Sequence, residues 1–163
     1  MKIFEELKED LLERAKKHSA CQDGYRMGLN AKSKKDLLET ITSYWFWVFR
    51  TSKMIDANYL EDNFSEEELS EAGIYTRKEH ASNTRAFACG SATVKACGSA
   101  TVEAYDSATV EAYGSATVEA YDNSYVEDCT GNINTVSDHG IVKDYYNHKI
   151  YIKKGKFEII EIE

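Results

Sequence analysis

The sequence contains no proline at all and only 9 glycines in 163 residues. Because proline removes a donor from a β-ladder, its absence is compatible with long, uninterrupted backbone ladders. The chain also lacks an apolar run long enough for a membrane helix, and Met1 to His18 has no apolar core of the secretory type. We therefore expect one or two small domains with no membrane partner.

Basic residues and cysteines are scarce as well. Lys and Arg number 20 against 28 Asp and Glu, and the net charge of −8 argues against direct binding of nucleic acid through a basic surface. The cysteines at positions 21, 89, 97 and 129 do not form a recognisable disulfide framework. We expect all of them to be reduced, which predicts a cytoplasmic location.

What the sequence has in abundance is a tandem octapeptide. Three near-identical copies, Gly98–Tyr105, Asp106–Tyr113 and Gly114–Tyr121, follow one another, and looser copies extend the array to eight octads over residues 82–145. In each central copy Ala, Val and Ala alternate with Ser, Thr, Glu and Tyr, which is typical of a strand with one buried face. The Gly or Asp that begins each copy favours a sharp turn. The array therefore predicts a β-solenoid built from strands of about seven residues and one-residue corners.

The corner residues also indicate the shape of one coil. They alternate between glycine and aspartate at positions 98, 106, 114 and 122, which favours a two-sided coil of 16 residues over a triangular coil of 24. The thin Ala-Val-Ala interior favours the flattened, two-sided form. Four such coils, stacked at ~4.8 Å, would form a rod roughly 20 Å long. The valines at the fifth octad position should point inward: Val94, Val102, Val110, Val118 and Val126.

A coil of this period places equivalent side chains above one another. Tyr105 would lie over Tyr121, and ladders of tyrosine and threonine would cover the outside. Lys95 would lie beside Glu111 and relieve part of the repulsion between stacked glutamates. The like-charged pairs expected from the register are Glu103 with Glu119 and Glu111 with Glu127.

The flanking segments predict end caps for the solenoid. Residues 2–18 carry apolar side chains on one helical face, and Ser33 and Ser65 each begin a capping pattern of a further helix. Residues 1–81 should form a small helical bundle that caps the first coil. Residues 146–163 predict a β-hairpin cap, with Lys149–Ile152 and Phe157–Ile162 paired around Gly155. The expected fold class is α+β.

Two of these segments resemble a known group of proteins. The stretch Ala20-Cys21-Gln22-Asp23-Gly24, followed by the capped helix with Trp45, resembles a small helical module of proteins from gut bacteria, their phages and mobile elements. The Ser-Ala-Thr-Val-Glu-Ala-Tyr octads are similar to tandem repeats that follow this module in such proteins. The resemblance covers most of the chain and implies the cytoplasm of a bacterial host cell, but it implies no activity.

The chain gives little support for catalysis, a metal or a cofactor. Its histidines, at positions 18, 80, 139 and 148, lie in no recognisable nucleophile or metal motif. Cys129 and His139 could approach each other near the last coils, but motif grounds favour unrelated surface residues. The octads lack the glycine-rich calcium pattern of β-rolls, and Glu103 and Tyr105 interrupt any flat hydroxyl array of the ice-binding kind. We expect a non-enzymatic protein with no metal and no cofactor.

The most usable surface consists of the glutamates and tyrosines at the sixth and eighth octad positions. Tyrosine brings a large contact area at small entropic cost, and glutamate attracts a basic partner. An alternative interpretation is that these are solvated strand residues multiplied by duplication. The predicted partner-binding residues are Glu103, Tyr105, Glu111, Tyr113, Glu119, Tyr121 and Glu127.

These expectations favour a protein that binds a basic surface of another protein. In sharper form, they predict a phage or mobile-element inhibitor of a bacterial defence nuclease, comparable in role to an anti-CRISPR protein. It would act by steric block or by acidic mimicry of a nucleic acid. One alternative is a structural or assembly module, in which the solenoid is a rigid spacer or forms a homo-oligomer through its ends. A third is an enzyme with its site in the helical bundle.

Overall fold

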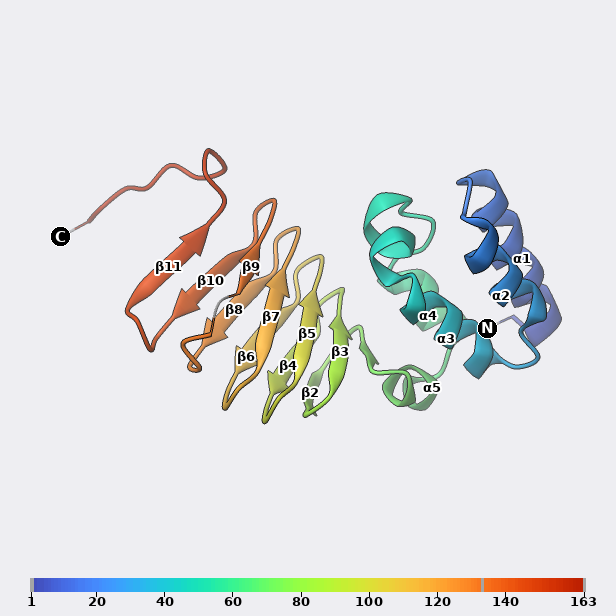
Figure 1. Cartoon of the computed structure of the whole chain (residues 1–163), viewed down its shortest axis with the longest axis horizontal. Coiled ribbons are helices and arrows are strands. Elements are labelled where there is room, and N and C mark those ends of the chain that lie inside the picture. Colours follow the sequence, from blue (N-terminus) through green and yellow to red (C-terminus); the bar gives the residue numbers. More distant parts are fainter. Residues whose placement is uncertain (1, 133, 163) are drawn as a thin grey trace. The chain divides into compact units, whose positions relative to one another are not determined.

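A computed structural model of the protein describes residues 2–132 and 134–162. The chain divides into two compact units, Met1–Ala72 and Gly73–Glu163. The described elements of the first unit are helices and those of the second are strands, so the α+β class is confirmed (Figure 1). The expectation that the helical bundle caps the first coil stays a prediction.

Short, individually capped helices make up the N-terminal unit. Leu7 and Leu11 are buried on the amphipathic first helix, as its pattern predicts. The side chains of Ser33 and Ser65 accept hydrogen bonds from backbone N–H groups three residues later, which confirms both predicted caps. Among the described residues, no helix has the length and apolar character needed to cross a membrane. The helices are α1 (Phe4–Lys17), α2 (Gln22–Asn30), α3 (Lys34–Ser43), the π-helix η1 (Phe46–Thr51), α4 (Ala57–Asn63) and α5 (Glu66–Glu71).

The π-helix overlaps a run of four aromatic residues, Tyr44 to Trp47, and was not predicted. Its wider turn is shown by Ser52, whose N–H donates to the carbonyl of Trp47 at 2.8 Å. The Trp45 and Phe49 rings stack with their centroids 4.6 Å apart, and both are buried. Phe46, in contrast, is exposed. The aromatic residues of this segment cannot all share one helical face, and the wider turn divides them between core and surface.

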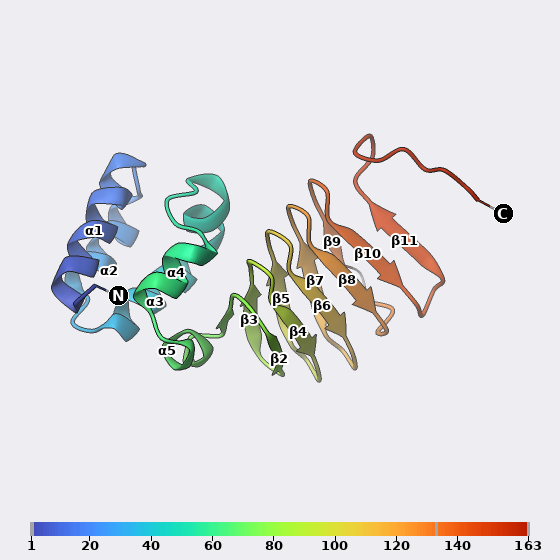
Figure 2. The same ribbon diagram turned by 180° about the vertical axis from the view of Figure 1, so that it is seen from behind.

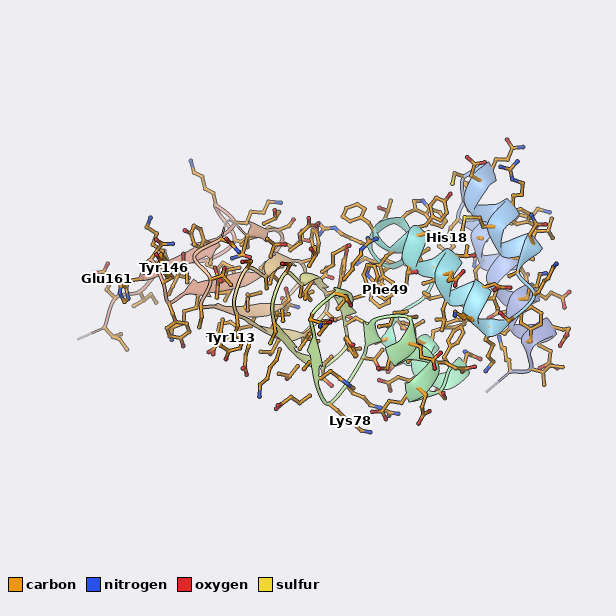
Figure 3. The ribbon with its side chains drawn as sticks, turned by 60° about the horizontal axis from the view of Figure 1, so that its bottom comes forward. His18, Phe49, Lys78, Tyr113, Tyr146 and Glu161 are labelled. Carbon is orange, nitrogen blue, oxygen red and sulfur yellow. The ribbon has the colours of Figure 1, made fainter. Side chains whose placement is uncertain are left out.

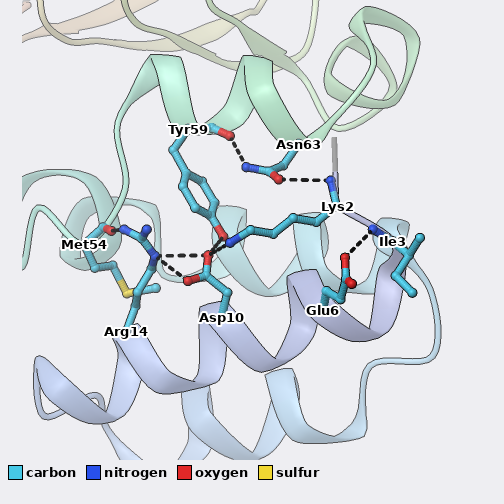
Figure 4. Close-up of polar contacts among 8 residues, drawn as sticks. All are labelled: Lys2, Ile3, Glu6, Asp10, Arg14, Met54, Tyr59 and Asn63. Atoms are coloured by element: carbon cyan, nitrogen blue, oxygen red, sulfur yellow. Dashed lines mark hydrogen bonds and ion pairs between the residues drawn. The ribbon is translucent and has the colours of Figure 1, made fainter.

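A partly buried carboxylate ties α1 to α4 (Figure 4). Asp10 accepts hydrogen bonds from the Tyr59 hydroxyl at 2.6 Å and from Arg14 Nε at 3.2 Å, and Lys2 Nζ lies 2.7 Å away. Arg14 also donates to the carbonyl of Met54 at 2.9 Å. Burial raises the pKa of Asp10, but the hydrogen bonds from Lys2, Tyr59 and Arg14 outweigh this effect and leave its pKa below the usual value. Asp10 is therefore ionised at neutral pH and holds the two helices together.

Parallel strands form two sheets in the C-terminal unit (Figures 1 and 2). Sheet A has the order β1-β3-β5-β7-β9, and sheet B has the order β11-β10-β8-β6-β4-β2. The described even-numbered strands all lie in sheet B, and the odd-numbered ones except β11 lie in sheet A, so successive octads alternate between the two sides. The strands are β1 (Ile74–Tyr75), β2 (Glu79–Ser82), β3 (Arg85–Ala88), β4 (Thr93–Ala96), β5 (Thr101–Ala104), β6 (Thr109–Ala112), β7 (Thr117–Ala120), β8 (Tyr125–Asp128), β9 (Thr135–Val136), β10 (Ile141–Asp144) and β11 (Lys149–Ile152).

The register confirms a two-sided coil of 16 residues. Val102 pairs with Val118 across sheet A, and Val110 pairs with Val126 across sheet B. The first coil differs, because Glu79 pairs with Thr93, an offset of 93 − 79 = 14 residues. The solenoid therefore begins earlier in the sequence than the octad that starts at Ser82, because β1 and β2 already belong to its two sheets.

Each regular octad consists of a four-residue strand and a four-residue turn, so the expected seven-residue strands were too long. The strand occupies positions four to seven, as in β5. The turn closes when the N–H of Ala108 donates to the carbonyl of Tyr105 at 3.1 Å, and the same bond recurs around the array. The corner residue between them, Asp106, has φ of 53°. A positive φ at this position is the requirement of the primed turns, which explains why only Gly and Asp begin the central octads.

Valine ladders fill the interior of the solenoid. The five predicted valines are at most 1% exposed, which confirms that they point inward. The last coil departs from this pattern, because Asp128 is buried where the central octads have Ala. Its carboxylate accepts hydrogen bonds from Thr130 N and Oγ1 and from Asn134 Nδ2, at 2.7–2.8 Å. The buried carboxylate thereby has three hydrogen-bond donors and holds Thr130 and Asn134 in place before β9.

Asparagine side chains complete the last rung of sheet A. Asn132 Nδ2 donates to the carbonyl of Ala116 at 2.8 Å, and Asn134 Oδ1 accepts from the N–H of Val118 at 2.9 Å. These bonds occupy backbone groups at and just before the start of β7, which a longer β9 would otherwise bind. The short β9 remains the last strand of sheet A.

A C-terminal antiparallel hairpin is present, but its strands are not the predicted ones. Strand β11 pairs with β10, with Ile152 opposite Ile141 and Lys149 opposite Asp144. Phe157–Ile162 forms no strand, and the Phe157 ring instead contacts His139 edge-to-face with centroids 5.8 Å apart. The hairpin turn is organised by Asp144, which accepts from Asn147 N at 2.8 Å. Pairing with β10 covers the open edge of the last coil, which a hairpin confined to the tail would leave exposed.

Candidate protein-binding surface

Charged residues form one row across the outer face of sheet B. Strand pairing aligns Lys95, Glu111, Glu127 and Lys143, so that a lysine stands at each end and two glutamates lie between them. The predicted stacking of Glu111 on Glu127 and of Lys95 on Glu111 is confirmed. The place of Lys143 in this row was not predicted. It occupies the sixth position of the last octad, so extending the 16-residue period from Glu127 gives its position.

Tyrosine hydroxyls bind both glutamates of this row. The Tyr113 hydroxyl donates to Glu111 Oε2 at 2.9 Å. Tyr125 and Tyr145 both donate to Glu127 Oε1, at 3.1 and 3.3 Å. The hydrogen bond to Glu111, together with partial burial, raises the pKa of Tyr113, so this hydroxyl stays protonated and remains a donor at neutral pH. The like-charged pair is therefore stabilised by donors on both of its members.

The lysines at the ends of the row are also held in place. Lys95 Nζ lies 2.6 Å from Glu79 Oε1, and this contact raises the pKa of Lys95 and lowers that of Glu79. Lys143 Nζ lies 4.5 Å from the centroid of the Tyr145 ring, and its hydrogen bond to Tyr145 raises its pKa. Both lysines carry a positive charge at neutral pH, so the row reads plus, minus, minus, plus.

Sheet A presents a different arrangement of the predicted residues. Tyr105 is 0% exposed, so the expectation that every tyrosine ladder covers the outside was wrong there. Its ring stacks on Tyr121 with centroids 4.9 Å apart, and its hydroxyl donates to Glu103 at 2.8 Å. The Tyr105 ring therefore lies along the sheet and does not project from it, because the ring contacts the next coil and the hydroxyl binds a residue of its own strand. Burial, and then the charge of Glu103, raise the pKa of Tyr105.

The glutamates of sheet A are paired as well. Arg85 Nη2 lies 2.9 Å from Glu103 Oε1, and the Tyr121 hydroxyl donates to Glu119. Tyr121 is almost fully buried, whereas Tyr113 on sheet B is 42% exposed (Figure 3). The seven predicted residues therefore divide between sheet A, where Tyr105 and Tyr121 stack and are buried, and sheet B, where Tyr113 is accessible.

The structure does not bring Cys129 and His139 together. Strands β8 and β10 are parallel, and Cys129 follows the end of β8 whereas His139 precedes the start of β10. The two residues thus lie at opposite ends of neighbouring strands. Within the part of the chain that the structure describes, no three His, Cys, Asp or Glu side chains gather in a way that could hold a metal ion.

The helical unit contains a small apolar pocket of about 60 Å³. Its lining comes from α1, α2, α3, η1 and adjacent residues, and includes Cys21 and Tyr44. Cys21 Sγ accepts a hydrogen bond from the N–H of Gly24 at 3.4 Å and thereby caps α2. None of the described lining residues is a histidine or a carboxylate. The pocket offers apolar contact and a thiol, but no general base.

Comparisons with protein-family models, with curated proteins and with solved structures found no match for this chain.

Proposed function

We propose that the chain is a non-enzymatic protein-binding protein that uses the outer face of sheet B. The binding surface, named here the tyrosine patch, consists of Glu111, Tyr113, Tyr125, Glu127 and Tyr145. This proposal keeps Glu111, Tyr113 and Glu127 from the predicted set. It leaves Glu103, Tyr105, Glu119 and Tyr121 on sheet A as structural residues.

The combination of exposure and fixed geometry carries this proposal. Tyr113 and Tyr145 are each 42% exposed, yet both hydroxyls are hydrogen-bonded to glutamates of the row beside them. Rings that are already held lose little conformational freedom when a partner binds, so more of the contact energy contributes to affinity. Exposed aromatic residues on a rigid sheet are the kind of group that dominates protein interfaces.

The charge row indicates which partner fits. Its acidic centre, Glu111 and Glu127, would attract a basic surface, whereas Lys95 and Lys143 limit the acidic region to two coils. A nucleic acid presents an uninterrupted line of negative charge, roughly one for each 1.7 Å of duplex. An interrupted row is a poor imitation of such a line. We therefore favour steric block over acidic mimicry.

The test compares the two faces of the same solenoid. The immobilised chain should retain one defined protein from bacterial lysate, and its affinity is then measured with the purified partner. Replacing Tyr113 and Tyr145 with Ala should weaken binding by about 10- to 100-fold, because buried aromatic anchors carry most of an interface's energy. The matched control replaces Thr101 and Thr117 on sheet A with Ala and should leave the affinity unchanged. Equal affinity in all three proteins would contradict the proposal.

In its sharper form, the proposed partner is a nuclease of a bacterial defence system. This form is supported by the resemblance of the helical segment and the octads to proteins of phages and mobile elements, and by the net charge of −8. The captured protein should cleave DNA or RNA, and adding the chain should inhibit cleavage in proportion to the bound fraction. A partner without nuclease activity would remove the inhibitor hypothesis but leave the tyrosine patch as its binding surface.

A further inference from the structure

The C-terminal end of the solenoid exposes a concentration of large apolar side chains. Ile150 on β11 is 66% exposed, and Ile159, Ile160 and Ile162 beyond it are 74%, 75% and 91% exposed. Tyr146, in the turn before β11, is also exposed (Figure 3). Single exposed apolar residues are ordinary on protein surfaces, but a group of them around one strand indicates an interaction surface.

Strand β11 also has a free edge. One edge pairs with β10, and among the described residues no strand pairs with the other. Sheet A ends in the two-residue strand β9, which offers a much shorter edge. Sheet B instead ends in a four-residue strand whose outer backbone groups are available for pairing.

The tail that follows β11 matches this edge in pattern and charge. Lys149 and Lys153 stand on either side of Tyr151 along one face of the strand and its extension. The tail Phe157–Ile162 carries Glu158 and Glu161 among aromatic and aliphatic side chains. In an extended segment Phe157 and Ile159 share one face and Glu158 lies on the other. A strand with this composition would neutralise the lysines and cover the exposed isoleucines.

We propose that the tail Phe157–Ile162 of a second copy of this chain pairs antiparallel with the free edge of β11. The chain's own tail leaves this edge open, because Phe157–Ile162 forms no strand. Pairing with a second copy would release Phe157 of the donating copy from its contact with His139. Reciprocal pairing of two copies closes a two-fold dimer. The proposal concerns the end of sheet B and is independent of the tyrosine patch.

One register pairs apolar residues of the tail with apolar residues of β11. It places Phe157 of the second copy opposite Ile152 and Ile159 opposite Ile150. Ile150 and Ile152 pair with Lys143 and Ile141 of β10, so these apolar contacts form on the outer face of sheet B. Directly opposed residues share a face of the sheet, which makes such pairs the units of sheet stabilisation.

The same register sets the charges of the other face. It places Glu158 of the second copy opposite Tyr151, diagonal to both Lys149 and Lys153. Diagonal neighbours in a sheet lie about 7–8 Å apart, within reach of long side chains.

The test is a charge exchange between edge and tail, measured by analytical ultracentrifugation of the full chain. The first variant carries Lys149→Glu and Lys153→Glu, and the second carries Glu158→Lys, which changes the acidic residue that lies diagonal to both lysines. Each variant alone should dimerise roughly tenfold or more weakly than the wild type, because like charges then face each other. An equal mixture should restore a dimer that contains one copy of each. Pairing of the tail with its own strand cannot produce this rescue.

Two further variants separate this dimer from other associations. Ile150→Lys should abolish it, whereas Ile3→Lys, which changes a similarly exposed isoleucine of the helical unit, should not. Tyr113→Ala should leave dimerisation intact, which distinguishes it from binding at the tyrosine patch. A monomeric wild type at its highest soluble concentration would overturn the proposal. So would dimers of both charge variants as strong as the wild-type dimer, or a mixture without hetero-dimer.

Discussion

The carboxylate of Asp106 accepts a hydrogen bond from the backbone N–H of Gly90, one coil earlier, at 3.0 Å. Asp122 does the same for the N–H of Asp106 at 3.3 Å. These aspartates adopt a positive φ, which is costly for a residue with a Cβ, and the charge-assisted bond offsets that cost. At the opposite corner a Cβ on Gly114 would lie 3.2 Å from the N and O of Gly98. One corner therefore selects Asp and the other Gly.

Two substitutions of Asp106 should separate the contribution of its hydrogen bond to stability from the cost of its backbone strain. Asp106→Gly removes the bond but tolerates the positive φ, and we expect the free energy of unfolding to fall by about 1–3 kcal/mol. Asp106→Ala also loses the bond and adds roughly 1 kcal/mol of strain. Urea denaturation measures both differences. An alanine variant as stable as the glycine variant would show that φ at this corner is not constrained.

Burying a charge in the valine ladder should unfold the solenoid locally or entirely. Val110 is completely buried, so Val110→Asp places a carboxylate among apolar groups at a cost of several kcal/mol. Thr109→Asp, one residue earlier on the outer face of β6, is the control and should change stability by less than about 1 kcal/mol. Thermal unfolding followed by circular dichroism compares them. Similar melting temperatures for the two variants would contradict the assigned interior.

Acid should weaken the last coil through Asp144. The hydrogen bond from the backbone N–H of Asn147, and then that from its side chain, hold the pKa of Asp144 below its ordinary value of 3.8. A lowered folded-state pKa stabilises the fold above the unfolded-state pKa, and this stabilisation is lost as pH falls through the folded-state pKa. The stability difference between wild type and Asp144→Asn should be constant above about pH 5 and shrink below pH 3.8.

Urea denaturation across this pH range measures that difference for Asp144. A difference that stayed constant down to the folded-state pKa and below would show that its ionisation does not stabilise the hairpin turn.

The first two strands should protect the start of the solenoid. A fragment that begins at Ser82 lacks β1 and β2, which pair with β3 and β4. It exposes two parallel edges at once, and we expect it to aggregate. A fragment that begins at Gly73 keeps both strands and ends sheet A in the two-residue β1, a shorter edge, so it should aggregate less. Light scattering of the two purified fragments makes the comparison, and equal solubility would show that these strands do not protect the edges.

The repeat could be predicted from sequence because its pattern is local and redundant. The alternation around Val102 and Val110, repeated every eight residues, assigns an inner and an outer face, and the alternating corner residues give the 16-residue coil. The strand length was overestimated because Ala108 continues the alternation although it closes a turn. Burial alone cannot distinguish a strand residue from an inward-facing turn residue.

The candidate site was predictable only in part. Register followed from the period, so the stacking of Glu111 on Glu127 was correctly predicted. The burial of Tyr105 was not, because identical octads predict identical exposure and its surroundings differ from those of Tyr113. The hydrogen bond from Tyr145 to Glu127 joins residues 18 positions apart and depends on how the last octad stacks.

The sequence by itself determined the α+β class, the two-sided coil and the inward valines, because each follows from a short pattern repeated many times. Only the tertiary structure decided the partner of β11 and the exposure of each tyrosine. Strand β11 could pair either with the tail Phe157–Ile162 or with the open edge of β10. Both segments contain β-branched apolar residues, so the sequence does not favour one over the other. Strand β11 pairs with β10 because this pairing satisfies the backbone hydrogen-bonding groups of the last coil. Those groups are left unpaired only once the coils have stacked.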